Sequence, residues 1–402
     1  MPISALSFSV LLNLSCQARV FNSKSDVRAH KIQAQTVETE PTLINLGSQS
    51  LDDISLRTKE FYRKSSPNIT DADFIFKWDY ALDSGDLKFL RSFVGAYYLD
   101  LMNVKGAGPL GICFGDAHLE NFGFVVFSDG PKFVYNDFDD SGYCPVGLDV
   151  LRYLTSLRLY EKKSSDFPDK VIKEYVEVLS GRRLPRKLDS SISFEPEKKR
   201  SKNIRNLIDG QKFAVSDEFA FVSASTTKKI KEVFATDVNL KKFKINDIVS
   251  TKKEGGGSAG LEKYLIYVVG TGDTNNEILE FKPVITPGTA AGNWKSMLEN
   301  RVEFLIKEFW ENSVPLNFYS VKMENTNYIL RSRTKGSVDL GSLNSDERLN
   351  LYKAQVGIIA KQHKKFWSES RDMKEWLSEN STFLSERYAK ILKHVSAKNS
   401  KN

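Results

Sequence analysis

Between Phe243 and Phe309 the chain has the pattern of a strand, a glycine-rich loop, two further strands and a helix. Phe243–Val249 alternates as a strand does, and Tyr264–Val269 and Ile278–Lys282 are runs rich in β-branched, aromatic or aliphatic residues. Trp294 to Phe309 has apolar residues on one helical face. Neither a Walker loop nor a Rossmann fingerprint fits, because no Gly-Lys-Ser/Thr follows the glycines and the next element is a strand.

The glycine-rich loop has the composition of a phosphate-binding loop. Glycines let backbone N–H groups approach a phosphate without interference from a Cβ, and a lysine on a neighbouring strand meets phosphates as a point charge. The alternative interpretation is a flexible surface hairpin with a solvated lysine. The residues concerned are Gly255, Gly257, Ser258, Gly260 and Lys282.

A second motif in the first half of the chain favours the phosphate interpretation. Asp116 is followed by Asn121, and Asp137 stands sixteen residues after Asn121 in the string YNDFDD. Phosphoryl transfer needs a carboxylate that orients or deprotonates the attacking hydroxyl, together with oxygen ligands for magnesium. Asp and Asn are also common in loops because they bond their own backbone. Two such motifs with a predicted hairpin between them favour chemistry.

Periodicity places these motifs on elements. Phe89–Leu101 is predicted to be one buried helix, and Gly111–Phe114 a strand that leads into the Asp116 loop. Further strands are predicted at Phe124–Phe127, Lys132–Tyr135, Phe318–Met323 and Tyr328–Ser332, and helices at Leu148–Leu159 and beyond Gly341.

The N-terminal residues 1–50 are predicted to be a leader and linker. A short apolar segment, Ile3–Leu14, precedes Cys16, as in exported or lipid-anchored precursors. A cytoplasmic chain with a frayed terminus is the alternative, because no positively charged residue precedes the segment and Asn13 stands where lipoprotein signals prefer an aliphatic residue. No apolar run reaches the roughly 20 residues of a membrane-spanning helix.

The composition limits which binding partners and which cysteine-based sites the chain can have. The net charge of +7 favours anionic partners only weakly, and the basic residues between Arg182 and Arg205 are interleaved with a single aromatic, Phe194. We therefore interpret this segment as a solvated insert without a strong nucleic-acid signal, and residues 181–240 as a basic insert and linker. Three cysteines, Cys16, Cys113 and Cys144, are too few and too scattered for a disulfide framework or a zinc cage.

The strings FGDAHLENFG, YNDFDDSG and GLDVLRYLTSL resemble the core of the bacterial "domain of unknown function 2252" family. LEFKPV, YILRSRTK and QVGIIAKQHKKF extend the resemblance over roughly residues 55–370. That family is grouped with the protein-kinase-like and aminoglycoside-phosphotransferase-like fold. The resemblance therefore implies an α+β, bilobal, protein-kinase-like fold.

The resemblance also implies roles for single residues. Asp116 would be the catalytic base, Asn121 and Asp137 the magnesium ligands, and Lys282 the residue that holds the nucleotide phosphates. Gly255, Gly257, Ser258 and Gly260 would cover the phosphates.

Other residues would support this site. Asp149 and Arg152 look like the pair that braces the catalytic loop in such folds, although an ordinary helix-terminal Asp and a salt-bridging Arg fit the sequence equally well. The carboxylate partner of Lys282 would be Glu299 or Glu303. Ser92 stands where the family usually has glycine, which weakens the case for its neighbour Arg91 as a site residue.

The catalytic motif precedes the glycine loop, so the lobe order is reversed, as in a circularly permuted kinase chain. Residues 51–180 and 336–402 would form the helical lobe, and residues 241–335 the nucleotide lobe. This arrangement predicts that the late helix carrying His363 packs beneath the Asp116 loop. We interpret His118 and His363 as structural.

The expected function is an ATP- and magnesium-dependent phosphotransferase that acts on an unidentified hydroxyl. A nucleotidyltransferase on the same fold and a non-catalytic nucleotide-binding scaffold are the alternatives. An exported protein would meet little ATP, so the leader and the kinase interpretation oppose each other.

Overall fold

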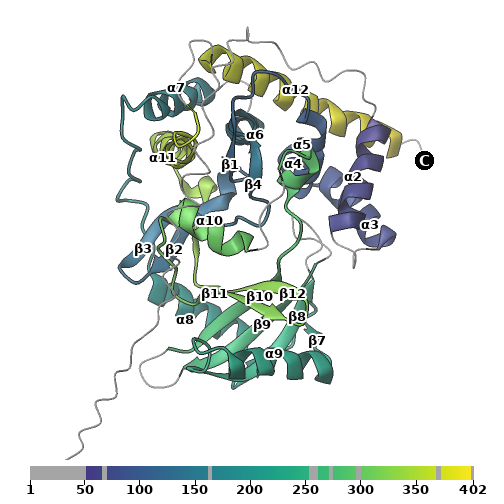
Figure 1. Ribbon diagram of the computed structural model, residues 1–402, viewed down its shortest axis with the longest axis vertical. Helices are drawn as coiled ribbons and strands as arrows, with labels where there is room; N and C mark the ends of the chain where they lie inside the picture. The colour runs from purple at the N-terminus through teal and green to yellow at the C-terminus, as the bar shows by residue number, and fades with distance from the viewer. Residues whose placement is uncertain are drawn as a thin grey trace, which may run out of the picture. The chain divides into compact units, whose positions relative to one another are not determined.

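The computed structural model describes residues 51–65, 70–161, 165–252, 261–270, 275–295, 300–367 and 373–399, which form a mixed α+β structure (Figure 1). The predicted leader and the glycine loop lie outside these ranges. No helix among the described residues has the length and apolarity that a membrane span requires.

A six-stranded antiparallel sheet contains the three strands predicted around the glycine loop. Its order is β11-β12-β10-β9-β8-β7. The strands are β7 (Ala220–Phe221), β8 (Phe243–Lys252), β9 (Glu262–Gly270), β10 (Glu277–Pro283), β11 (Phe318–Met323) and β12 (Thr326–Ser332). Alternation along β10 places Leu279 and Phe281 on one face and Ile278 and Lys282 on the other.

A helix packs on each face of this sheet. The α9 helix (Ala224–Thr236) buries Ile230 and Phe234 against one face (Figure 1), and α8 (Pro196–Leu207) covers the other with Ile204 and Leu207. The sequence did not predict α9, which lies within the residues interpreted as insert and linker. Ile230 and Phe234 have the i, i+4 spacing of a buried stripe, which the surrounding lysines obscured.

The rest of the chain is mainly helical, around a second core. The α6 helix (Val146–Glu161) lies in this core and is buried on all sides from Val146 to Leu157. The α11 helix begins with a capping box, in which Asn344 and Glu347 satisfy each other's backbone N–H groups. The other helices here are α2 (Leu51–Ser65), α3 (Asp71–Asp83), α7 (Phe167–Leu179), α10 (Arg301–Trp310), α11 (Ser345–His363) and α12 (Met373–Asn399).

The predicted helix Phe89–Leu101 is two helices, α4 (Asp86–Ser92) and α5 (Val94–Leu101). Phe93 separates them with φ −129° and ψ 68°. Its ring packs 4.9 Å from Trp78 and 5.7 Å from Tyr62, measured between centroids. The sequence carries no Gly or Pro at this break, so only the tertiary packing of Phe93 reveals it.

Two small sheets end at the predicted site. The strand β1 (Leu110–Cys113) pairs with β4 (Gly142–Pro145), and β2 (Phe122–Phe127) pairs with β3 (Gly130–Tyr135). Asp116 follows β1, and Asp137 follows β3. The remaining elements are β5 (Ile208–Asp209), β6 (Lys212–Phe213), β13 (Gly336–Ser337), η1 (Leu119–Asn121), η2 (Gly288–Gly292) and η3 (Leu340–Ser342).

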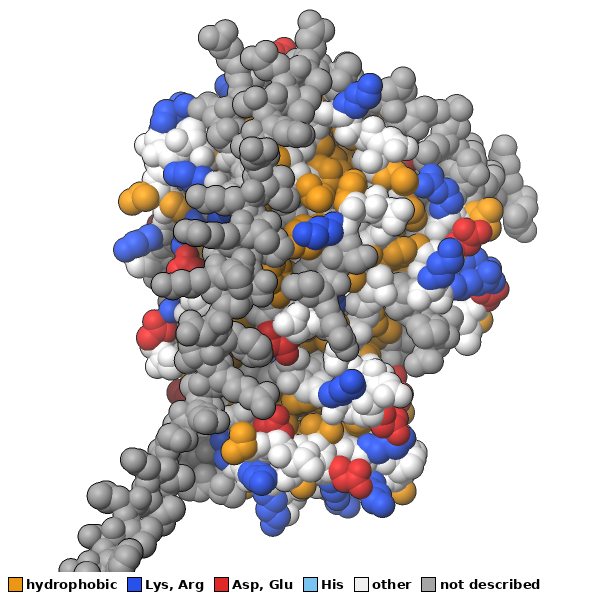
Figure 2. Space-filling view, in the orientation of Figure 1, with side chains coloured by type: hydrophobic (Ala, Val, Ile, Leu, Met, Phe, Trp, Pro, Cys, Tyr) orange, Lys and Arg blue, Asp and Glu red, His pale blue; other side chains and the backbone are white. Residues whose placement is uncertain are grey.

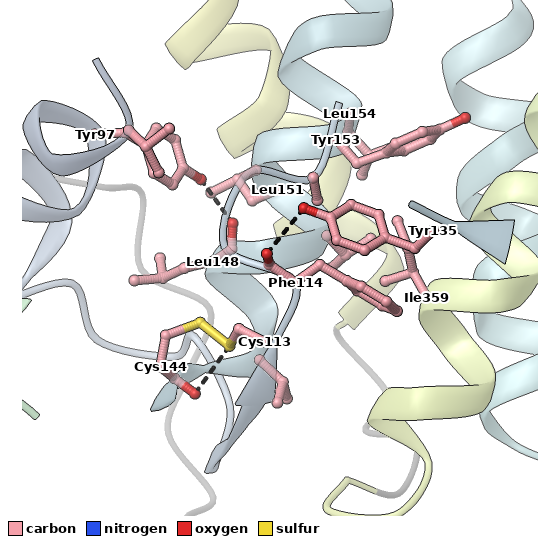
Figure 3. Close-up of a cluster of buried hydrophobic side chains, with 14 of the residues drawn as sticks. Tyr97, Cys113, Phe114, Tyr135, Cys144, Leu148, Leu151, Tyr153, Leu154 and Ile359 are labelled. Carbon is pink, nitrogen blue, oxygen red and sulfur yellow. Dashed lines mark hydrogen bonds between the residues drawn. A yellow bond between two sulfur atoms is a disulfide. The ribbon is translucent and has the colours of Figure 1, made fainter. Parts of the chain in front are cut away.

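A disulfide joins Cys113 on β1 to Cys144 on β4 within the buried core (Figure 3). Their Cα atoms are 5.8 Å apart, within the usual range for a disulfide. Sequence spacing did not predict this pair, because the antiparallel pairing of β1 with β4 brings the two residues together.

Basic side chains are spread among acidic ones on the face shown in Figure 2, and the described side chains of that face form no single basic field. Arg183, in the basic segment, is paired with Glu174 at 3.1 Å and with Glu177 at 2.9 Å. Both glutamates lie on α7, so this arginine of the basic segment is paired with that helix.

Candidate functional site

Asp116 lies in a tight turn after β1, in which its backbone N–H donates to Phe114 O at 3.0 Å. Gly115 has a φ of +80°, and a Cβ there would lie 2.0 Å from Asp140 O, so the turn requires glycine. Asp149 accepts the backbone N–H of Phe114 at 2.7 Å and that of Gly115 at 3.0 Å. The predicted bracing role of Asp149 is confirmed.

His363 on α11 contacts the carboxylate of Asp149. Its Nε2 lies 3.1 Å from Asp149 Oδ2, and its Nδ1 lies 2.9 Å from the hydroxyl of Tyr175. A carboxylate only accepts, so Nε2 donates to Asp149, and Nδ1 shares the second hydrogen bond with the tyrosine hydroxyl. The prediction that this helix packs beneath the Asp116 loop is therefore confirmed, and His363 serves the loop's structure.

The carboxylate of Asp116 is surrounded by donors. Arg152 donates to Oδ1 from Nη2 at 2.6 Å and from Nε at 3.1 Å. Asn121 donates from Nδ2 to Oδ2 at 3.1 Å and to the backbone oxygen of Asp116 at 2.9 Å. The predicted brace Arg152 thus contacts the carboxylate itself, and Asn121 keeps its Oδ1 as the atom able to ligate a cation.

His118 is the remaining donor to Asp116. Its Nδ1 accepts the backbone N–H of Glu120 at 3.1 Å, so Nε2 carries the proton and faces Asp116 Oδ2 at 3.3 Å. Burial lowers the pKa of His118, which favours this neutral form. Burial alone would raise the pKa of Asp116, but His118 and Arg152 hold it well below its ordinary value. Asp116 is therefore ionised at neutral pH.

Asp137 is half-buried, and its Oδ1 accepts no hydrogen bond from the described residues. Arg331 Nη1 lies 3.6 Å from this oxygen. Burial alone would raise the pKa of Asp137, but Lys282 and Arg331 hold it well below its ordinary value. An ionised carboxylate with one unsatisfied oxygen has the chemistry of a ligand for a hard cation.

Lys282 on β10 forms an ion pair with Asp139, and both side chains are largely buried. Burial lowers the pKa of Lys282 to about 8, against the opposing effect of Asp137. Arg301 on α10 donates to the backbone oxygen of Asp139 at 2.6 Å and to Ile285 O at 2.8 Å. The acidic segment after β3 is thus held by residues from the second half of the chain.

Asp140 in the same segment is held by the residues of η2. Its Oδ1 accepts the backbone N–H of Gly288 at 2.8 Å, and its backbone oxygen accepts the hydroxyl of Thr289 at 3.1 Å. Burial and the charge of Asp116 raise its pKa to about 6. The neighbouring carboxylates Asp116 and Asp140 therefore have pKa values shifted in opposite directions, a pattern typical of functional sites.

The remaining predicted site residues either lie outside the described residues or do not contact the site. Gly255, Gly257, Ser258, Gly260 and Glu299 lie outside the described residues. Glu303 is exposed on α10, and Lys282 is paired with Asp139 instead. The expectation of a partner on the helix is therefore wrong for Glu303.

Sequence reasoning missed Asp139, Asp140, Arg331 and Lys77. The first two stand beside Asp137 in the string NDFDD, where the density of acidic residues was the available signal. Lys77 on α3 is buried, with its Nζ 4.4 Å from the ring centre of Tyr62, and burial lowers its pKa to about 7. No pattern in the sequence distinguished Lys77 from the other lysines.

The site thus combines ionised carboxylates with cations from distant segments. Within the described residues, no group of three His, Cys, Asp or Glu side chains could hold a metal ion by itself. Magnesium is typically bound through one or two carboxylates together with water and substrate phosphates, so Asp137 and Asn121 match its needs.

Residues 84–180 match the family described as "Uncharacterized protein conserved in bacteria (DUF2252)". The match supports the resemblance to this family over the part of the chain that carries Asp116, Asn121 and Asp137. No curated protein and no solved structure matches the chain.

Proposed function

We propose that the protein is a magnesium- and ATP-dependent phosphotransferase with a bilobal, protein-kinase-like fold and a reversed lobe order. The observation that carries this proposal is the ion pair between Lys282 and Asp139. Because of it, the lysine of the second strand after the glycine loop lies against the acidic segment that contains Asp137. A phosphate-binding lysine beside a metal-binding carboxylate is the arrangement that phosphoryl transfer requires.

Asp137 and Asn121 are the residues that would hold magnesium. The metal and the nucleotide supply the transferable phosphoryl group and neutralise its charge when bound. The low pKa of Asp137 keeps it ionised for this role. Lys282 meets phosphate oxygens, and its burial strengthens the contact because nearby water is excluded. Gly255, Gly257, Ser258 and Gly260 would cover the same phosphates with backbone N–H groups.

Asp116 would accept the hydrogen bond of the acceptor hydroxyl and orient it. Its carboxylate is fixed by Arg152 and His118, so its direction is defined before a substrate arrives. A carboxylate with a lowered pKa binds a proton weakly, so Asp116 contributes mainly by positioning.

The test is a thermal unfolding series of the full chain with ATP, GTP, ADP and AMP, each with and without magnesium. A ligand that binds the native state raises its stability, so we expect an upward shift with a triphosphate that needs magnesium. A protein unaffected by every nucleotide would contradict the proposal.

Two alternative functions share the same residues. With an acceptor in hand, ATP labelled at the γ-phosphate gives a labelled product in phosphoryl transfer, whereas label at the α-phosphate is transferred by a nucleotidyltransferase. Mass spectrometry of the product separates these outcomes by the mass that is added. Nucleotide binding without consumption for any acceptor favours a non-catalytic scaffold.

A further inference from the structure

A cavity of about 830 Å³ is lined in part by residues of the segment 181–192. This segment leads from α7 toward α8 (Figure 1). Its walls come from β2, β3, α7, α10 and α11. The volume is in the range of small-molecule sites in proteins. None of the residues that the proposed reaction uses lines it, so any ligand of this cavity binds outside the proposed active site.

The lining has an apolar body. Five aromatic rings contribute to it, and those of Phe114 and Phe309 stack with centroids 4.4 Å apart. Leu188, Ile192 and Ile358 add aliphatic surface. Such a lining favours a ligand with a substantial hydrocarbon part.

The polar part of the lining is mainly cationic. Three acidic side chains line the cavity, Asp189, Glu308 and Glu311. Glu308 is paired with Lys365 at 3.2 Å and Glu311 with Lys361 at 2.5 Å, whereas Asp189 accepts the backbone N–H of Ser191 at 2.9 Å. Lys187 and Lys364 also line the cavity, are exposed and form no ion pair within the described residues. The cavity mouth therefore retains positive charge.

A buried donor adds a second, independent indication. Gln362 on α11 lines the cavity and is 4% exposed. Its Nε2 has no hydrogen-bond partner among the described residues. A buried donor without a partner is costly, and a ligand oxygen would remove that cost.

We propose that this cavity binds an amphipathic anion, with a hydrocarbon body among the aromatic rings and a carboxylate or phosphate head near Lys187, Lys364 and Gln362. Charge complementarity selects the anion, and the apolar walls require the hydrocarbon. The bound molecule would contact Phe114 and Tyr135, which stand two residues before Asp116 and Asp137. Its binding is independent of the proposed phosphotransferase activity.

Isothermal titration calorimetry of the full chain with decanoate tests this proposal. Decyl phosphate distinguishes the two head groups, while decanol and decyltrimethylammonium carry the same chain without a negative charge. All are used below the concentrations at which they form micelles. We expect saturable binding of decanoate, decyl phosphate or both, and at least about tenfold weaker binding of the neutral and cationic compounds.

Two variants locate the head group. Gln362→Glu replaces the donor by an acceptor, and Lys364→Gln removes a rim charge at an exposed position, where folding is not at risk. Each should raise the dissociation constant of the better-binding anion several-fold. Lys307→Gln, an exposed lysine on α10 that does not line the cavity, is the matched control and should leave it unchanged.

The proposal is overturned if neither anion binds saturably, or if decanol binds as tightly as the anions. It is also overturned if Lys364→Gln and Lys307→Gln bind the anion equally well. A loss of folding in Gln362→Glu leaves the Lys364→Gln comparison decisive.

Discussion

Lys282 on β10 and Asp139 after β3 form an ion pair, although they lie in different halves of the chain. The two side chains are 5% and 14% exposed. Arg301 donates to the backbone oxygen of the same aspartate at 2.6 Å. The acidic segment is therefore tied to the six-stranded sheet by Lys282 and to α10 by Arg301.

Removing one member of this ion pair should cost about 3–5 kcal/mol of unfolding free energy, because the other charge stays buried without its partner. Lys282→Met and Asp139→Asn are the single changes, and the double variant should lose clearly less than the sum of the two. Urea unfolding of all four proteins gives the coupling energy. Strictly additive losses would show that the two residues do not interact in solution.

The succession of strands along the chain and the loops that carry Asp116 and Asp137 could be predicted from the sequence. Alternating apolar residues defined β8 to β12, and the Asp116 and Asp137 strings fell on loops after strands, as expected. These features are local, since periodicity and turn residues act within a few positions.

The partners of the site residues could not be predicted. No role was predicted for Asp139, and Lys282 was expected to pair with Glu299 or Glu303 on the helix that follows it. Their contact depends on how two packed regions meet, which no short sequence pattern encodes. The break at Phe93 was missed for the same reason, because ring packing outweighs helix propensity there.

Alanine variants of Asp116 and Asp137 should affect different steps, one turnover and the other magnesium-dependent nucleotide binding. Asp116→Ala should reduce turnover by about 10²–10⁴-fold and leave nucleotide-induced stabilisation largely intact. Asp137→Ala should abolish the part of that stabilisation that needs magnesium. Thermal unfolding with and without magnesium, together with product formation, measures both.

Asp129→Ala is the control for these variants, since Asp129 is 63% exposed in the turn between β2 and β3. It should match the unmodified protein in both measurements. Equal turnover of the unmodified protein and both site variants would refute the assignment of the site.

The disulfide should contribute to stability. Cys113 and Cys144 close a loop with a sequence separation of 31, and losing such a link typically costs about 3 kcal/mol. Cys113→Ser with Cys144→Ser should lower the free energy of unfolding measured in urea by that amount, whereas Cys16→Ser should not. A tryptic digest without reductant should contain the linked peptides, and only free thiols there would contradict the pairing.

The contribution of Asp140 to the free energy of unfolding should fall as pH rises, whereas the contributions of Asp116 and Asp137 should fall as pH decreases. Its pKa in the folded state, about 6, is above the ordinary 3.8, so the folded state binds the proton more tightly. The stability that this proton provides is complete below the ordinary pKa and is lost as pH rises through 6. Asp140→Asn keeps an acceptor for Gly288 and stays uncharged, so it should exceed the unmodified protein in unfolding free energy by up to about 3 kcal/mol at pH 7–8. The difference should vanish near pH 4. Urea unfolding of both proteins across this range, with Asp129→Asn as the exposed control, measures it. A difference independent of pH would show that Asp140 has an ordinary pKa.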